Sequence, residues 1–442
     1  MRGVWLIAIA ACGCAGAGAY GRYEGLVRAS TERVAEGSAT APLSTRAAMV
    51  RAAVSHDPGI TARAARVRSM VETARAEGAP PSPEVNAQVW NVPFSRPWAL
   101  GDADMYMVEL RQRLPAWGSL DARARASLAG ADAALAELSA REREVARRAT
   151  EAWADYVASA LHHRVHHDHL AIVEEMRGAT TARVAVGSGL DELARVELER
   201  TRVLRLLARF DNDRERASRV LEVLTGRRPS APTELDDEAA GETTSLTREA
   251  LVERALARQQ RMREARARVD AARATLDGAR AEASRPEFRV GLSGWFDPNH
   301  HNGYGATVAM TLPWLWGPGG ARVAAGEAGL AAEEASVREA EFTTREEVIE
   351  AHARVEGIAR ELSLVRVDAL PAARRALDVA RGRYVAGGGQ LLAWLDVARM
   401  RLDLAMDEAD LVVDLARAIA ALEEAVGEAL PRVALEREGG AR

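Results

Sequence analysis

The sequence predicts a mainly helical chain with a small β portion, in which two similar halves follow one another. The chain has 442 residues, of which 48% are hydrophobic but only 5% aromatic. Because alanine supplies much of the apolar total, this composition favours closely packed helices. An internal repeat and several long amphipathic stretches point to the same fold class.

The first residues predict export from the cytoplasm. Arg2 precedes an apolar run over residues 4–11, and the residues up to Cys12 fit a bacterial lipoprotein cleavage site. We therefore expect Cys12 to be the lipid-bearing N-terminus, with an ordinary secretory signal cut after Ala19 as the alternative. No later stretch approaches the roughly 20 apolar residues of a spanning helix. A membrane crossing would then require a closed β-barrel.

The charged residues and the cysteines exclude several classes of function. All 59 basic residues are arginine and 64 residues are acidic, which leaves a net charge of -5. This balance predicts no nucleic-acid partner. Cysteine occurs only at positions 12 and 14, so the folded body holds no thiol for a disulfide, a metal ligand or a nucleophile. No catalytic motif is found either, and we predict a protein that is not an enzyme and needs no cofactor.

Landmarks of the first half recur in the second half, in the same order, at a shift of about 200 residues. They are residues 74–77 and 279–282, Pro83 and Pro286, Trp117 and Trp316, Gly187 and Gly387, and Gly226 and Gly427. We therefore predict a signal or lipoprotein segment (1–19), a first structural repeat (20–226), an acidic linker (227–245), a second structural repeat (246–430) and a C-terminal tail (431–442).

Each half predicts a very long helix, a glycine-rich turn and a second long helix. Apolar residues recur at threes and fours over residues 120–183, which indicates an amphipathic helix. At 1.5 Å per residue this helix would reach on the order of 100 Å, too long for the core of a compact domain. The second half repeats the pattern over residues 321–385 and 391–426, where Pro371 predicts a kink or a restart of the helix.

Two strands are predicted in each half, ahead of the long helix. Apolar side chains alternate over residues 288–296 and 304–312, and Tyr106, Val108 and Leu110 alternate with Glu109 and Arg111. One side is lipid-like and the other polar, as in the wall of a membrane barrel. Since such barrels need about eight strands, four strands per chain require an oligomer, and a trimer would supply about twelve. Small soluble hairpins at the end of a helical stalk are the alternative.

These features resemble the TolC family of outer-membrane factors over nearly the whole chain after the signal. The matching motifs are the LPxWG and LPWLWG junctions from strand to helix, and the second-half residues Leu370, Pro371, Tyr384, Gly387, Leu391, Leu392, Leu395 and Asp396. The resemblance implies duplicated long antiparallel helical hairpins plus four strands per protomer. A homotrimer would join a twelve-stranded barrel to an α-helical barrel, lying in the lipid of the bacterial outer membrane and extending into the periplasm. The implied function is a passive channel-tunnel for tripartite efflux or type I secretion, with a periplasmic adaptor protein and an inner-membrane transporter as partners.

The resemblance also implies that the adaptor docks on the turns of the helical hairpins. A sharp reversal between helices needs glycine for its positive φ and lets a partner approach the backbone. The same glycines would make the turn with or without an adaptor. The implied docking positions are Val186, Gly187, Ser188, Gly189, Gly387, Gly388 and Gly389.

Family members close this tip with acidic rings and polar links. By resemblance, Asp396 takes an acidic ring position, Tyr384 takes a linking position, and Asp191 is the candidate partner from the first half. Ala393 stands where a second acid is common and Gly389 where arginine can occur, so the network departs from the family pattern. Asp396 either forms a threefold ring that selects cations or is only a solvated helix residue.

Histidines crowd one segment of the first long helix. His162 and His166, and likewise His163 and His167, are spaced so that each pair shares one helix face and can bind Zn²⁺ or Cu²⁺. A solvated polar patch is the alternative. The cluster favours a heavy-metal cargo over drugs or a secreted protein, but it does not identify the cargo.

Two other classes of protein share part of this pattern. A periplasmic adaptor also has helical hairpins, but it should carry one hairpin flanked by lipoyl-like and β-barrel segments. A coiled-coil structural protein of the envelope would lack amphipathic strands. Duplicated strand pairs therefore distinguish the duct from both.

Overall fold

The computed structural model describes residues 25, 28, 42–185, 187, 189–230, 241–297 and 302–434, so Cys12 lies outside the described residues. The chain forms two compact units, and each takes segments from both halves of the sequence. The first unit contains Arg63–Glu137 and Arg261–Ala340, and the second contains the described parts of 29–62, 138–260 and 341–442. No helix in the described part of the chain is both long and apolar enough to cross a bilayer.

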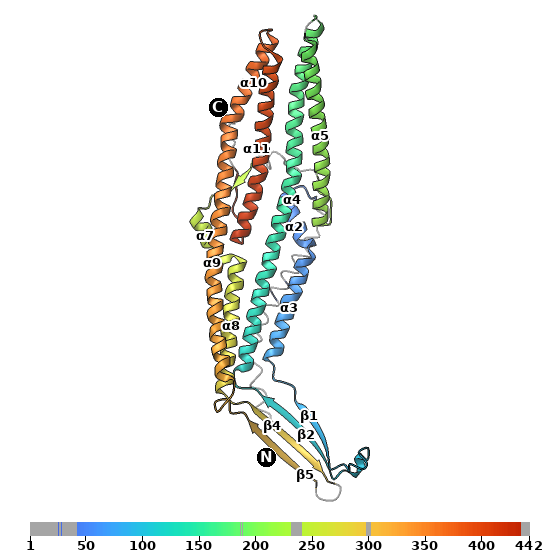
Figure 1. Cartoon of the computed structure of the whole chain (residues 1–442), viewed down its shortest axis with the longest axis vertical. Helices are drawn as coiled ribbons and strands as arrows, with labels where there is room; N and C mark the ends of the chain where they lie inside the picture. The colour runs from blue at the N-terminus through green and yellow to red at the C-terminus, as the bar shows by residue number, and fades with distance from the viewer. Residues whose placement is uncertain are drawn as a thin grey trace. The chain divides into compact units, whose positions relative to one another are not determined.

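The first unit contains one antiparallel sheet in the order β1-β2-β4-β5 (Figure 1). Its strands are β1 (Glu84–Trp90), β2 (Met105–Leu114), β4 (Phe288–Phe296) and β5 (Gly303–Met310), and a short turn, η2 (Leu100–Asp102), lies in the β1–β2 connection. The predicted strands are thus present, and β2 of the first half pairs with β4 of the second half. One sheet therefore joins both halves of the chain.

The apolar side chains of all four strands share one face of this sheet. The register aligns Val85 with Leu110, Leu110 with Leu292, and Leu292 with Ala306. Val85, Leu110 and Leu292 are all exposed, although each is a large aliphatic side chain. The alternation predicted from the sequence is confirmed, and it leaves a whole apolar face uncovered in the described chain.

The opposite face is polar. Glu109 and Arg111 lie on it as a pair, with 2.7 Å between the carboxylate and the guanidinium. Gly291 makes room for this carboxylate, because a Cβ atom there would lie 2.7 Å from a Glu109 oxygen. The two faces of the sheet thus differ sharply in chemistry.

Long helices lie before and after the strands along the chain. In the first unit α3 (Pro58–Gly78) packs against α4 (Ser119–Ala185), and Val71 of α3 is buried with Ala131 of α4. The helices α8 (Gln260–Ser284) and α9 (Gly319–Leu364) also run through this unit. Small residues allow close approach, since a Cβ atom added at Gly278 of α8 would lie 3.4 Å from the Ala122 methyl group of α4.

The second unit is formed by the remaining helices, α2 (Arg46–His56), α5 (Leu190–Thr225), α7 (Arg248–Arg258), α10 (Leu370–Val385) and α11 (Leu391–Val426), with parts of α4 and α9. Two short strands, β3 (Glu242–Thr243) and β6 (Val433–Ala434), pair beside them. The largest buried side chains of the main core include Trp153, Leu221 and Leu362. Gly226 ends α5 and Gly427 ends α11, both in the left-handed conformation that favours glycine.

Asp57 fixes the junction between α2 and α3. Its carboxylate accepts from the Ile60 N–H at 3.0 Å and from two nitrogens of Arg141 at 2.7 and 3.2 Å. Burial raises the pKa of Asp57, but the hydrogen bonds and the charge of Arg141 outweigh it and leave the pKa below its ordinary value. This carboxylate is therefore part of the packing between two segments far apart in sequence.

The predicted interruption at Pro371 is present. A π-helical turn, η3 (Val365–Ala369), separates α9 from α10, and Pro371 lies in the first turn of α10. Proline has no backbone N–H to donate, and its ring would collide with the carbonyl oxygen four residues earlier. The helix therefore widens there. Arg366 in this turn donates to a Glu408 carboxylate oxygen of α11 at 2.8 Å.

Candidate functional site at the tip of the hairpins

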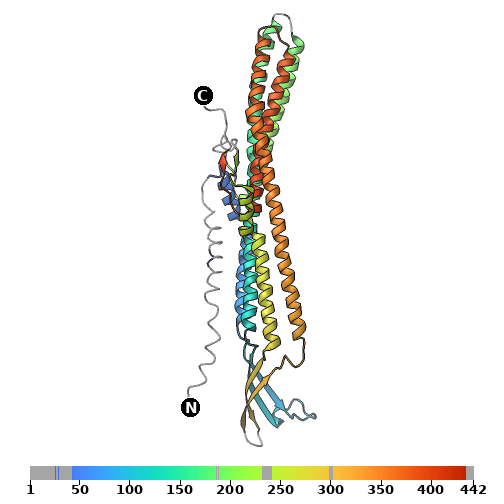
Figure 2. The same cartoon turned by 90° about the vertical axis from the view of Figure 1, so that its left-hand side faces the viewer.

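The helical hairpins α4–α5 and α10–α11, drawn in Figure 2, reverse at the predicted glycines. Gly187, Gly189 and Gly387 have φ of 89°, 88° and 81°, a region that L side chains rarely adopt. The predicted positions Val186 and Ser188 lie outside the described residues. The glycines that were predicted from the pattern thus do make the turns.

Gly388 and Gly389 follow Gly387 but differ from each other. A Cβ atom at Gly388 would meet nothing within 4 Å, whereas at Gly389 it would lie 2.8 Å from the Tyr384 nitrogen and 2.9 Å from the Arg383 carbonyl carbon. Gly389 is therefore required by packing of the turn on itself. The surface of Gly388 is open to a partner.

A small hydrophobic core joins the two hairpins just behind these turns. It contains buried residues of α4, α5, α10 and α11. Its members are Val173, Met176, Val196, Tyr384, Leu391, Trp394, Leu395 and Ala398. Since α4 and α5 come from the first half and α10 and α11 from the second, separating the two hairpins would have to disturb this core.

Tyr384 carries the polar link across this core. Its side chain is 2% exposed, and its hydroxyl donates to a Glu192 carboxylate oxygen at 2.9 Å. The hydroxyl of Thr180 lies 3.2 Å from the Tyr384 hydroxyl, and the Arg183 guanidinium lies 4.8 Å from the centre of the Tyr384 ring. The partner is thus Glu192 and not the predicted Asp191. In the sequence, the only indication of Glu192 was its position next to Asp191 in the first turn of α5.

The two predicted acids lie on the surface of the same unit. Asp396 and Asp191 are exposed, at the start of α11 and of α5. The charge of Asp396 acts on the nearby Arg399 of the same helix. The described chain therefore presents both carboxylates to water and places neither of them in the Tyr384 link.

A second polar contact lies deeper between the hairpins, and the sequence did not reveal it. Glu199 of α5 is 3% exposed and lies 2.5 Å from the Arg399 guanidinium of α11. His169 of α4, which is fully buried, places its Nε2 atom 3.6 Å from the same carboxylate. His169 and then Arg399 hold the pKa of Glu199 at about 2, although burial opposes them. At 3.6 Å the histidine contact is longer than an ordinary hydrogen bond, so we regard Arg399 as the main partner.

The predicted histidine ligands turn toward different partners. His162 lies 2.8 Å from an Asp410 oxygen, and His163 lies 3.8 Å from Asp211. His166 is buried with its Nδ1 atom 3.1 Å from the His162 carbonyl, and burial lowers its pKa. His167 stacks on His163 with ring centres 6.5 Å apart. Within the described ranges, no three metal-binding side chains converge on one point.

A family model and several solved structures of known proteins match this chain. The family model of the outer membrane efflux protein matches residues 251–428. No curated protein gives a significant match to the chain.

Several solved outer-membrane channels share the fold. VceC from Vibrio cholerae has a TM-score of 0.67 and 16% identity, over 87% of this chain and 96% of that one. MtrE from Neisseria gonorrhoeae has a TM-score of 0.67 and 19% identity, over 86% of this chain and 88% of that one. CusC has a TM-score of 0.70 and 15% identity, over 87% and 92% of the two chains. At these identities the similarity establishes the fold.

Proposed function

The chain belongs to the outer membrane efflux protein family, and we propose that three copies of it close one passive duct that runs from the outer membrane into the periplasm. The family consists of channel proteins and not of known enzymes. A periplasmic adaptor or a coiled-coil protein of the envelope would not account for a four-stranded amphipathic sheet. We therefore favour the duct over both alternative functions.

The observation that carries this proposal is the sheet. Its apolar face is exposed on all four strands, and β1 and β5 each pair on one side only within the described residues. Unpaired edges and an exposed apolar face are both costly in a protein that works alone in water. In lipid the apolar face is covered, and pairing of β5 with β1 of the next copy removes both edges.

The strand count then sets the stoichiometry. Because the four strands alternate in direction, β5 of one copy meets β1 of the next as an antiparallel pair. Three copies would supply about twelve strands, which exceeds the minimum of about eight for a membrane barrel. The polar face that carries Glu109 and Arg111 would line the lumen.

The tip of the hairpins is the proposed gate. Tyr384 and Glu192 would hold the two hairpins of one copy together in the closed state. The exposed Asp396 and Asp191 would form acidic rings around the threefold axis and favour cations there. The turns at Gly187 and Gly387 would dock the periplasmic adaptor, which connects the duct to an inner-membrane transporter.

The cargo is proposed only as a solute handed over by that transporter. The histidines of α4 bind separate partners, which gives no support to a metal cargo. We therefore propose the duct without assigning a metal to it.

Conductance of the reconstituted protein tests both the duct and its gate. The full chain in detergent should be a trimer and should form pores in planar bilayers. Tyr384→Phe removes a hydrogen bond to a charged group, which contributes about 1.5–3 kcal/mol, so open probability should rise by about tenfold or more. Tyr156→Phe is the matched control, since Tyr156 is buried in the main core of the same unit.

The outcomes separate the two claims. A monomer that forms no pores contradicts the trimeric duct. A trimer whose pores respond equally to both tyrosine substitutions contradicts the assignment of Tyr384 to the gate.

A further inference from the structure

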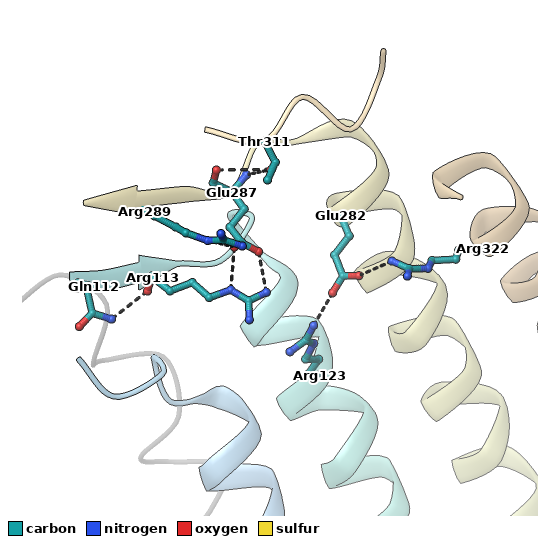
Figure 3. Close-up of polar contacts among 8 residues, drawn as sticks. All are labelled: Gln112, Arg113, Arg123, Glu282, Glu287, Arg289, Thr311 and Arg322. Carbon is teal, nitrogen blue, oxygen red and sulfur yellow. Dashed lines mark hydrogen bonds and ion pairs between the residues drawn. The ribbon is translucent and has the colours of Figure 1, made fainter. Parts of the chain in front are cut away.

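Arginines gather where the sheet meets the helices of the first unit (Figure 3). Arg113 of β2 and Arg289 of β4 are direct cross-strand partners on the polar face. Two like charges in this position repel each other unless a counter-charge lies between them. Glu287 supplies it, since its carboxylate binds two nitrogens of Arg113 at 2.8 and 2.7 Å and lies 3.4 Å from Arg289.

Glu287 is held in place by the backbone on the other side. Its N–H donates to the Thr311 hydroxyl at 2.9 Å, and the Thr311 N–H donates to its carbonyl at 3.0 Å. The carboxylate is therefore a fixed part of the junction between strand and helix. One carboxylate neutralises one guanidinium, so this triplet keeps one positive charge.

A second triplet repeats the arrangement on the adjoining helices. Glu282 of α8 lies 2.6 Å from Arg123 of α4 and 3.9 Å from Arg322 of α9. The charge of Glu282 also acts on Arg113, so the two triplets are neighbours. Figure 3 shows both groups side by side at the same end of the sheet. The second triplet again keeps one positive charge.

Exposure decides which charges meet the solvent. The arginine side chains of the two triplets are 48% to 63% exposed, whereas Glu287 is 17% and Glu282 is 32% exposed. The Arg111 pair follows the same rule, with the arginine 39% and Glu109 6% exposed. Glu84 is also exposed and acts on Arg113, so it offsets one of the two excess charges. The two triplets, the Arg111–Glu109 pair and Glu84 together are therefore positive by one charge per chain and present mostly guanidinium groups to water.

We infer that these arginines form a ring in the lumen that favours anionic solutes, such as those that carry carboxylate or phosphate groups. The inference rests on the proposed duct, in which the polar face of the sheet lines the lumen and three copies repeat the arrangement. Rings of arginine or lysine select anions in pores, because guanidinium groups bind carboxylate and phosphate well. The cationic ring thus lies in the sheet unit, whereas the acids of the proposed gate belong to the other unit.

The test removes the excess charges without leaving a carboxylate unpaired. Arg289 and Arg322 are the more distant partners in their triplets, at 3.4 and 3.9 Å. The double variant Arg289→Gln with Arg322→Gln leaves Glu287 on Arg113 and Glu282 on Arg123. The readout is the chloride-to-potassium permeability ratio, taken from the reversal potential of full-chain pores under a KCl gradient.

We expect the ratio to fall by about threefold in the double variant at low salt, which corresponds to a change of about one RT in the local ion energy. The change should shrink toward 1 M salt, because screening shortens the reach of these charges. The variant Arg289→Lys with Arg322→Lys keeps the charges and should retain the ratio. Arg125→Gln is the matched control, since Arg125 lies two residues beyond Arg123 and hence on the opposite side of α4.

A second readout uses a polyanion as a probe. Citrate added on the barrel side should reduce the current of wild-type pores more than that of the double variant. Pores with an unchanged permeability ratio and unchanged citrate block in the double variant overturn the inference and leave the duct intact. Failure to form pores at all removes the duct and this inference together.

Discussion

Replacing Arg399 by methionine should loosen the contact between α5 and α11 at the tip. The change removes the main partner of Glu199, a carboxylate that is 3% exposed. Methionine retains most of the length and the apolar stem of arginine. The variant therefore leaves a buried carboxylate without its main partner.

The expected cost follows from the geometry. Removal of one partner from a buried ion pair costs about 3–5 kcal/mol. The Arg399 side chain is 41% exposed, so we expect the lower end, about 3 kcal/mol. The lowered pKa of Glu199 has the same sign, although His169 contributes to it together with Arg399.

The lowered pKa of Glu199 also determines how the stability of this contact depends on pH. The folded state lowers the pKa of Glu199, so the contribution of the pair to stability is complete above about pH 4.5. It is lost as the pH falls from about 4.5 to about 2, where the folded carboxylate takes up its proton. In the Glu199→Gln variant, the stability of the contact between α5 and α11 should no longer show this loss between about pH 4.5 and pH 2.

Hydrogen exchange of the full chain at pH 7 measures the effect locally. A loss of about 3 kcal/mol raises the exchange rate of amides in α5 and α11 near the pair by about a hundredfold. The double variant Glu199→Gln with Arg399→Met should recover much of the loss, because it leaves no charge buried. A rise of less than about threefold in the single variant, or no recovery in the double variant, would refute the reasoning.

Three further predictions test other parts of the molecule. Gly389→Ala places a Cβ atom 2.8 Å from the α10 backbone and should destabilise the turn by about 1–3 kcal/mol, whereas Gly388→Ala, in open space, should change it little; hydrogen exchange of the turn separates them. Val308→Arg puts a charge on the apolar face and should cost about 2–4 kcal/mol and lower the yield of membrane-inserted trimer, whereas Thr307→Arg on the opposite face should be tolerated. Asp57→Asn should lower thermal stability near pH 7, and its difference from the wild type should shrink as the pH falls below about 4, where the wild-type carboxylate, with its lowered pKa, loses its contribution to stability.

Much of the local structure was predictable from periodicity. The first long helix was predicted over residues 120–183 and runs over Ser119–Ala185, and the last was predicted over 391–426 and runs over Leu391–Val426. Apolar spacing sets the buried side of a helix or strand within a few residues, so it is legible in a single sequence. The interruption at Pro371 was predictable for the same reason, since a proline acts on its own helix.

The contacts between the halves of the chain were not predictable in this way. The partner of Tyr384 was expected to be Asp191 and is Glu192, although both residues lie in the first turn of α5. Which of the two points inward depends on how α5 rotates against α10, and a rotation of about 100° per residue decides it.

The sequence by itself thus determined the elements, their lengths and the side of each that is apolar, because these depend on neighbours along the chain. Only the tertiary structure decided that β2 pairs with β4, that Glu199 meets Arg399, and that Arg113 and Arg289 share one carboxylate. These residues lie about 175 to 200 positions apart, and no local pattern encodes their meeting. It follows from the packing of whole helices and the register of whole strands.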